Sequence, residues 1–223
     1  ASAGSACRAA AAAARAYGLQ VRLVRTRIDD DAARLGVRFA ASLAWQPAGV
    51  VQIRRGESTV NLPAQPGRGG RNQHLALAAA LEFERRGLHD AHLLAAGTDG
   101  IDGAGSDAGA LVDDETCQRG RDAGCDPIDS LARADSGTFL EAAGDLLHTG
   151  PTLTNVGDLV LGLRLGSKQG SAQADPFVEL LLEARGEARK QKLWALSDLI
   201  RDRLAALGVS IEDGKDGTTW RWS

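Results

Sequence analysis

The stretch GRGGRNQHLALAAALEFERRGLHDAHLLAAGTDGIDG, residues 67–103, holds a loop, a helix and a strand in close succession. Its glycine-rich start at 67–71 leads into a run of good helix formers that predicts a helix over 72–86. The short apolar run 92–96 predicts a strand, which ends in the polar loop 97–103. Helices that alternate with buried strands in this way are typical of a layered α/β domain.

The flanking sequence predicts further elements of the same α/β domain, whose sheet we expect to be mixed. Upstream we expect a helix over 4–17, a strand over 20–26, a helix that ends at Trp45, and a hairpin of the runs 49–54 and 58–62. Downstream we expect helices over 114–123 and 136–146 and a strand over 159–165. In an open α/β sheet, ligands gather at the loops that follow the strands, so these loops are the place to look for a site.

Composition narrows the class of protein. Hydrophobic residues make up 43% of the 223 residues and charged residues 25%, which is ordinary for a soluble globular protein. The net charge of −3 argues against sequence-nonspecific binding of nucleic acid, which needs a basic surface. It favours the chemistry of small molecules. No run approaches the ~20 apolar residues of a membrane span, so we expect no membrane partner and a cytoplasmic location.

The cysteines and the start of the chain add two further expectations. Cys7, Cys117 and Cys125 form no CxxC pair and have no nearby His, so we expect buried or idle thiols in a reducing cytosol rather than a zinc site. The chain starts at Ala1 and contains no Met, so we expect a piece of a longer protein or an artificial chimera.

The character of the sequence changes near residue 166. The run 166–173 is small and polar, as linkers are. Asp175 and Pro176 predict the start of a helix, and a second amphipathic helix is expected over 193–207. We therefore expect an α/β domain over 1–165, a linker over 166–175, and over 176–223 a small C-terminal helical hairpin module with a short terminal β-hairpin.

The glycine-rich loop is the first candidate site. Glycines let backbone N–H groups approach an anion, and the helix that follows points its positive end the same way. Arg68 and Arg71 add planar, permanently charged donors, and His74 lies one turn into the helix. A flexible surface loop with solvated arginines is the alternative.

Two more loops carry polar groups. Asp99, Asp102 and Asp107 are spaced by glycines and suit Mg²⁺, which needs only one or two protein ligands, or a substrate hydroxyl. Ordinary Asp-Gly turn chemistry is the alternative. The hydroxyls and the amide of 149–155 suit phosphate oxygens, and equally a tight turn.

Four short motifs follow one another in order: GGRNQ at 69–73, GTDGIDG at 97–103, TGPT at 149–152, and TNV at 154–156 with Asp158. In this order they resemble the MOFRL domain, the C-terminal part of the bacterial glycerate 2-kinases, some of which carry the name hydroxypyruvate reductase. The resemblance extends over residues 4–165.

This resemblance implies phosphorylation of glycerate with ATP and Mg²⁺, in a cleft between this domain and a larger N-terminal domain. It implies that Arg71 and Arg68 are catalytic residues that neutralise charge, and that Asp99 and Asp102 bind metal. The residues implied to contact substrate or nucleotide are Gly69, Gly70, Asn72, Gln73, Thr98, Thr152, Thr154 and Asn155.

The sequence departs from the family pattern at several positions. Arg55 stands where a second glycine is usual before Gly56, and His74 where Glu is usual. Leu153 and Gly157 replace the usual Gly and Asn of the last loop. The N-terminal kinase domain of the family has no counterpart here. We therefore expect no turnover from this chain alone, and an N-terminal kinase domain on another chain is one expected partner.

The tail is similar to the C-terminal end of bacterial cysteinyl-tRNA synthetases over residues 175–223, with DPFVELLL at 175–182 and TTWR at 218–221. That region of the synthetases helps hold the anticodon end of tRNA. The resemblance implies RNA contacts from Arg189, Lys190, Arg201, Arg203 and Trp220.

Two functions remain open on this basis. One is a glycerate kinase-type domain that forms one side of a phosphoryl-transfer site. The other is a non-catalytic RNA-binding or interaction protein that acts through the tail. From residue 176 on the chain carries eight Lys or Arg and eight Asp or Glu, so a helical docking module with solvated charges is the alternative to RNA binding.

Overall fold

The computed structural model describes residues 2–165, 175–206, 209–214 and 217–222. The chain divides into two compact units, Ala1–Gly166 and Ser167–Ser223, each with its own hydrophobic core. Most of the linker predicted over 166–175 lies outside the described residues. Among the described helices, none is long and apolar enough to cross a membrane.

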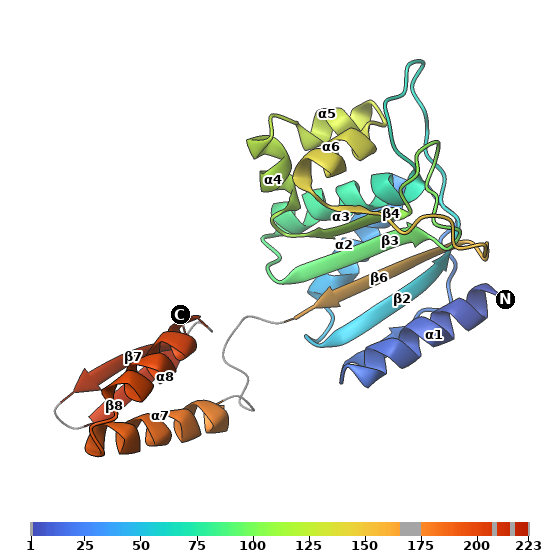
Figure 1. Cartoon of the computed structure of the whole chain (residues 1–223). Coiled ribbons are helices and arrows are strands. Elements are labelled where there is room, and N and C mark those ends of the chain that lie inside the picture. The colour runs from blue at the N-terminus through green and yellow to red at the C-terminus, as the bar shows by residue number, and fades with distance from the viewer. Residues whose placement is uncertain (1, 166–174, 207–208, 215–216, 223) are drawn as a thin grey trace. The chain divides into compact units, whose positions relative to one another are not determined.

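The first unit contains helices and strands in alternation (Figure 1). The helices are α1 (Ala3–Ala16), α2 (Ala32–Ala44), α3 (Arg71–Arg86), α4 (Thr116–Asp122), α5 (Pro127–Ala132) and α6 (Ser136–Ala143). The strands are β1 (Gln20–Leu23), β2 (Val50–Gly56), β3 (Ala91–Gly97), β4 (Gly109–Asp113), β5 (Leu146–Leu147) and β6 (Asp158–Arg164). The helix and strand predicted over 72–86 and 92–96 are confirmed as α3 and β3.

One six-stranded sheet in the order β1-β2-β6-β3-β4-β5 forms the centre of this unit. β1 is parallel to β2, whereas every other neighbouring pair in the sheet is antiparallel. Because β6 lies between β2 and β3 and runs opposite to both, β1, β2 and β3 all end at the same edge of the sheet. The predicted mixed sheet is confirmed.

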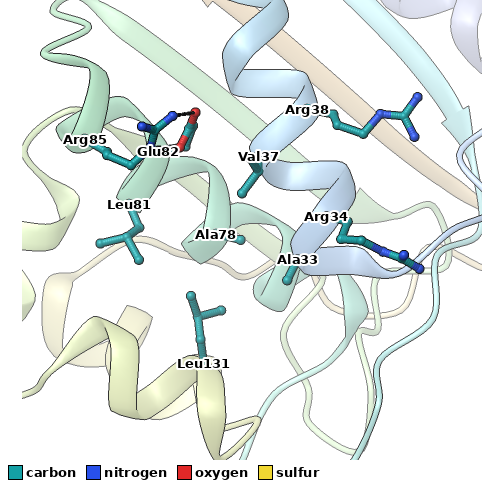
Figure 2. Close-up of a pocket in the computed structure, with 9 residues that line it drawn as sticks. All are labelled: Ala33, Arg34, Val37, Arg38, Ala78, Leu81, Glu82, Arg85 and Leu131. Carbon is teal, nitrogen blue, oxygen red and sulfur yellow. Dashed lines mark hydrogen bonds and ion pairs between the residues drawn. The ribbon is translucent and has the colours of Figure 1, made fainter.

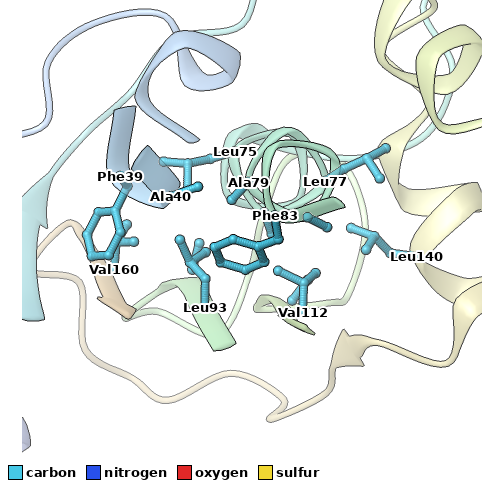
Figure 3. Packing of buried hydrophobic residues seen from close by; sticks show 14 of the residues in the cluster. Phe39, Ala40, Leu75, Leu77, Ala79, Phe83, Leu93, Val112, Leu140 and Val160 are labelled. Carbon is cyan, nitrogen blue, oxygen red and sulfur yellow. The ribbon is translucent and has the colours of Figure 1, made fainter. Parts of the chain in front are cut away.

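The helices α2 and α3 cover one face of the sheet with a closed core. Phe83 of α3 is fully buried and lies among Leu93, Val112 and Leu140 (Figure 3). Burying an aromatic side chain of this size contributes roughly 1.5–3 kcal/mol from its area alone. Phe39 of α2 packs over β6 at a glycine, because a Cβ there would collide with its ring. This face therefore fixes how the helices, and the loops between them, sit on the sheet.

The opposite face is only partly covered. α1 packs Cys7 and Ala11 against β2, on Val51 and Ile53. Beyond α1, a hollow of about 320 Å³ exposes apolar side chains of the central strands, and Leu111 of β4 is 51% exposed. One helix thus covers the β1–β2 side of this face, and the rest stays open in the described part of the first unit.

The hairpin predicted from the runs 49–54 and 58–62 is wrong. β2 pairs with β1 along one edge and with β6 along the other, so neither edge is free. The chain after Gly56 makes only single parallel bridges, from Gly56 to Ile28 and from Thr59 to Asp31. Strands distant in sequence prevail because they bring apolar faces to β2 that a polar hairpin partner lacks.

Smaller differences lie in the second half of the unit. The helix predicted over 136–146 ends as α6 at Ala143, where Gly144 takes a left-handed conformation with φ of 80°. The next residues pair with β4 as the two-residue strand β5. The helix predicted over 114–123 is confirmed as the shorter α4, whereas β4, β5 and α5 were not predicted from the sequence.

The second unit consists of α7 (Asp175–Lys190), α8 (Trp194–Ala206), β7 (Val209–Gly214) and β8 (Gly217–Trp222). The two strands pair antiparallel, and a small core gathers Val178, Leu204 and Val209. The predicted helical hairpin with a terminal β-hairpin is confirmed.

Candidate functional site

The three polar loops singled out in the sequence meet at the edge where β1, β2 and β3 end. A Cβ at Gly103 would lie 2.7 Å from the Gly69 carbonyl oxygen, and one at Gly100 would collide with the carbonyl oxygen of Gly150. The loop after β3 therefore lies between the glycine-rich loop and the loop before β6. The glycines are required by this close approach, and Gly100 also has φ of 85°.

Arg71 is held by a buried carboxylate. Its Nε donates to Oδ2 of Asp158 at 2.6 Å and its Nη2 to Oδ1 at 2.9 Å, while Glu57 lies 3.3 Å from the same Nη2. Asp158 is 1% exposed, whereas a third of the Arg71 side chain remains accessible. The hydrogen bonds to Asp158 raise the pKa of Arg71, so it stays charged at any working pH. This pair presents a fixed cation at the loop junction.

The side chain of Arg68 bonds α6 rather than Asp158. Its Nη2 donates to the Gly137 carbonyl oxygen at 2.9 Å and to Glu141 at 2.7 Å, both on α6. Its backbone N–H donates to Asp135, the residue before that helix. The two predicted catalytic arginines therefore share no carboxylate among the described residues, and Arg68 anchors the loop to α6.

Asp102 closes the start of α3. Its Oδ1 accepts from the backbone and side-chain amides of Asn72 at 3.0 and 3.1 Å, and its Oδ2 accepts from the Gln73 backbone at 2.8 Å. Burial raises the pKa of Asp102, while these hydrogen bonds oppose the rise. A Cβ at Gly70 would collide with the same carboxylate. The positive helix end that the sequence offers to a ligand anion is thus already occupied by a side chain.

Asp99 is the more accessible of the two predicted metal-binding residues. Its Oδ2 accepts from Asn155 at 3.1 Å and its Oδ1 from the Ile101 backbone at 3.2 Å. The third aspartate, Asp107, lies 2.8 Å from Nδ1 of His148 instead. Within the part of the chain that the structure describes, no group of three or more His, Cys, Asp or Glu residues could hold a metal ion.

The threonines of the site join the loops to each other. Oγ1 of Thr98 donates to the Gly157 carbonyl at 2.7 Å and accepts from the Val156 N–H at 2.9 Å. Oγ1 of Thr152 donates to the Thr98 carbonyl, and the Thr154 N–H reaches Oγ1 of Thr152 at 3.3 Å. These predicted binding residues therefore hold the loop before β6 against the end of β3.

A hollow of about 350 Å³ adjoins Arg71, and Gly69, Gly70, Ser58 and His74 line it. Oγ of Ser58 is buried and finds no hydrogen-bond partner in the described part of the chain. Both side-chain polar atoms of Gln73, on the first turn of α3, also find no partner in the described residues, but Gln73 does not line this hollow. Buried polar atoms without partners are costly, so this hollow suits a polar ligand.

Two of the residues around this hollow escaped the sequence reasoning. Asp158 was part of a motif but was not assigned to the site, although a carboxylate at the start of an apolar strand is an unusual position that marks it. Ser58 lay in the wrongly predicted hairpin. His74 was a weak candidate, and its Nδ1 lies 3.0 Å from Oγ of Ser136, while burial lowers its pKa.

A larger hollow of the first unit lies elsewhere. It has a volume of about 510 Å³ and runs between α2, α3 and α5, over Val37, Leu81 and Leu131 (Figure 2). The arginines at its rim already have carboxylate partners, Arg34 in Asp30 and Arg85 in Glu82. None of the predicted site residues lines this groove, so the polar loops remain the candidate site.

In the second unit most predicted RNA-contact residues are engaged within the unit. Arg189 bonds Asp213 at 2.7 Å and Lys190 bonds Glu187 at 2.7 Å. Arg201 lies 3.4 Å from Asp198, and Nε1 of Trp220 donates to Glu179 at 2.6 Å. Of the four charged residues among the five, Arg203 alone has no ion pair within the described residues, and it is exposed.

Comparison with known families agrees with both resemblances noted in the sequence. Residues 50–158 match the MOFRL family, and residues 173–221 match the cysteinyl-tRNA ligase anticodon binding domain. The first unit is therefore similar to the MOFRL family over residues 50–158, and the second is similar to an anticodon-binding domain over residues 173–221.

Individual relatives agree. D-glycerate 2-kinase of Thermotoga maritima is 39% identical over 167 residues, which is 70% of this chain and 39% of that protein. Glycerate kinase of Homo sapiens is 38% identical over 168 residues, 64% of this chain and 32% of that protein. Cysteine–tRNA ligase of Fusobacterium nucleatum is 56% identical over 63 residues, 27% of this chain and 13% of that protein.

Solved structures support the fold. The crystal structure of the Thermotoga maritima glycerate kinase has a TM-score of 0.69 at 36% identity, over 73% of this chain and 40% of that one. A Pyrococcus horikoshii protein has a TM-score of 0.67 at 32% identity, over 73% of this chain and 38% of that one. This chain thus spans about a third to two fifths of the length of the glycerate kinases named here.

Proposed function

We propose that the first unit forms one side of an ATP-dependent phosphoryl-transfer site for glycerate. The observation that carries the proposal is Arg71, which Asp158 fixes beside a polar hollow. Its Nη1 has no hydrogen bond in the described part of the chain, and a fixed guanidinium suits a carboxylate or phosphoryl oxygen. The MOFRL match and the glycerate kinases among the relatives suggest the substrate class.

In this proposal the residues around the hollow divide the work of binding. Arg71 binds the anionic group of the substrate and offsets the charge that develops during transfer. Ser58 bonds a substrate hydroxyl with the Oγ that lacks a protein partner. Asp158 keeps the Arg71 guanidinium in one orientation, and Asp102 fixes the helix start that carries it.

ATP and Mg²⁺, when bound, supply the phosphoryl group and neutralise its charge. Asp99 fits a metal-binding role, because its carboxylate is only half-buried and accepts just two hydrogen bonds. Asp102 fits that role poorly, because three hydrogen bonds to the start of α3 surround its buried carboxylate. Mg²⁺ commonly takes one or two carboxylates beside water and phosphate oxygens, so one protein carboxylate on this side is sufficient.

We propose further that a kinase domain outside this unit completes the site. The supporting observations are the short coverage of the glycerate kinases and the apolar face that α1 leaves open. The described loops offer one wall, and phosphoryl transfer depends on groups that surround the reacting atoms. We therefore expect no ATP-dependent phosphorylation of glycerate by this chain alone, and measurable turnover would contradict this part of the proposal.

The binding role is tested by calorimetric titration of the full chain with D-glycerate, with glycerol as the uncharged comparison. We expect D-glycerate to bind and glycerol not to bind. Arg71→Ala should weaken D-glycerate binding by about tenfold or more, because it removes a charged hydrogen-bond donor. Arg85→Ala is the matched control, because Arg85 pairs with Glu82 in the last turn of α3, whereas Arg71 begins that helix. Absent glycerate binding, or equal binding by Arg71→Ala, would overturn the proposal.

A second candidate function rests on the second unit. Its match to the anticodon-binding domain favours binding of tRNA, and we propose the cytoplasm as the place of this binding. A gel shift with tRNA tests this function at two salt concentrations, with a chain that lacks residues 176–223 as comparison. Salt-sensitive binding that the deletion abolishes would support it. Arg203→Glu should weaken binding and Arg15→Glu should not, since Arg203 is the exposed candidate that forms no ion pair with any residue the structure describes.

A further inference from the structure

Three arginines on the α1 side of the first unit lack acidic partners. Arg8 lies on α1, Arg25 follows β1, and Arg55 lies near the end of β2. None of the three forms an ion pair within the part of the chain that the structure describes. On the other side of the sheet, the arginines of α3 to α5 that are exposed pair with carboxylates, among them Arg85, Arg121 and Arg133.

The three arginines line one pocket of about 340 Å³. A Cβ at Gly4 would lie 3.5 Å from Nη1 of Arg8 and 3.7 Å from Nη1 of Arg55, so both guanidinium groups reach the same point. Cys7 lies at the same pocket, and although burial raises its pKa, Arg55 and Arg8 both pull that pKa down. Among the residues that line this pocket there is no Asp or Glu.

Converging cations without counter-charges repel each other, and Arg55 is also half-buried. A bound anion relieves both costs, and guanidinium groups from three elements can contact several anionic oxygens at once. The pocket volume lies within the range of small-molecule sites. A single carboxylate has too few oxygens to engage all three arginines, which favours a ligand with several phosphate groups.

We propose that Arg8, Arg25 and Arg55 form a binding site for a small polyphosphate anion, separate from the hollow beside Arg71. The two hollows have no lining residue in common. Arg55 occupies a position where the MOFRL resemblance leads us to expect glycine, so this site belongs to this chain's own sequence. The ligand is either the phosphate chain of a nucleotide or a free inorganic polyphosphate, since both present the same groups.

The test is calorimetric titration of the full chain with sodium tripolyphosphate at low ionic strength. We expect binding that weakens by about tenfold or more in Arg8→Ala and in Arg55→Ala, because each removes one charged contact. Arg15→Ala is the matched control, since Arg15 is exposed on the same helix and outside the pocket. A saturating concentration of D-glycerate should leave tripolyphosphate binding unchanged, which separates this site from the proposed glycerate site.

Three results would overturn the proposal: no binding of tripolyphosphate, equal weakening by Arg15→Ala, or loss of tripolyphosphate binding when D-glycerate is present. If Arg55→Ala does not fold, Arg55→Gln keeps the side-chain bulk and serves in its place. ATP and AMP distinguish the two sources of the ligand. Binding of ATP as tight as that of tripolyphosphate, with AMP much weaker, identifies a nucleotide phosphate chain, whereas weaker binding of ATP identifies a free polyphosphate.

Discussion

The two faces of the sheet differ in how far their apolar side chains are covered and their arginines are paired. On the side of α2 and α3, a continuous core is closed, and Arg85 and Arg121 at its surface carry carboxylate partners. On the side of α1, one helix covers part of the sheet, leucines remain exposed, and three arginines have no partner in the described part of the chain. Unmatched charge and unmatched apolar area thus occur on the same face. The comparison teaches that the first face serves stability and that the second is free to bind other molecules.

The largest contrast should appear in the stability of the two faces. Phe83→Ala empties a fully buried position on the closed face and should lower the free energy of unfolding by about 3–5 kcal/mol. Leu111→Ala removes a half-exposed side chain from the open face and should cost less than about 1 kcal/mol. Urea denaturation of the two variants measures both values. Equal losses would remove the distinction between the faces.

The two arginines of the glycine-rich loop should also differ. Arg71→Ala leaves the buried carboxylate of Asp158 without its bidentate partner and should destabilise the fold by about 2–4 kcal/mol. Arg68→Ala breaks an ion pair whose two side chains are largely exposed and should cost less than about 1 kcal/mol. Thermal and chemical denaturation of both variants provide the measurement. A larger loss for Arg68→Ala would show that the loop anchor, not the Asp158 pair, maintains this edge.

His74 should contribute to the pH dependence of the free energy of unfolding. Burial lowers the pKa of His74, so the unfolded chain takes up a proton at a higher pH than the folded chain does. The His74 contribution to stability is therefore present above the unfolded pKa of about 6.5 and is lost as the pH falls through it. His74→Gln should flatten the fall in stability between pH 7.5 and about pH 5.5. His89→Gln is the control, because His89 is exposed, and an equal change in both variants would contradict this assignment.

The smallest expected effect belongs to the unpaired arginines. Arg55→Gln removes one of the converging cations and should change the free energy of unfolding by no more than about 0.5 kcal/mol, in the direction of greater stability. Its melting temperature at low and high salt supplies the measurement. A clear loss of stability at low salt would show that Arg55 has a structural role, and the contrast between the two faces would then rest on the exposed leucines.

The sequence predicted local elements better than partners. The helix over 72–86 follows from helix propensity within one segment, and its bounds differ by one residue from those of α3. The hairpin around Gly56 failed because pairing of β2 depends on β6, about a hundred residues further along the chain. The short strand β4 has Gly and Ala at its start, so periodicity could not reveal it.

In the candidate site, too, the residue types could be predicted from the sequence but their partners could not. Arg68 and Arg71 are equivalent in the sequence, yet one bonds α6 and the other bonds the start of β6. The metal role of Asp102 came from the resemblance and stays a prediction, while the structure adds that its oxygens accept hydrogen bonds from the start of α3. Chemistry can be read from residue types, but the choice between a ligand and a protein partner depends on contacts between distant segments.

The cap at Asp102 has a mechanical consequence. Because its carboxylate grips the first amides of α3, the loop after β3 and the helix start that carries Arg71 must move together. A ligand that displaces Asp99 or Gly100 would therefore also displace the guanidinium of Arg71 through the hydrogen bonds of Asp102. Binding of a ligand to this loop would then slow deuterium uptake at the Asn72 and Gln73 amides, so exchange at the first turn of α3 would report the binding.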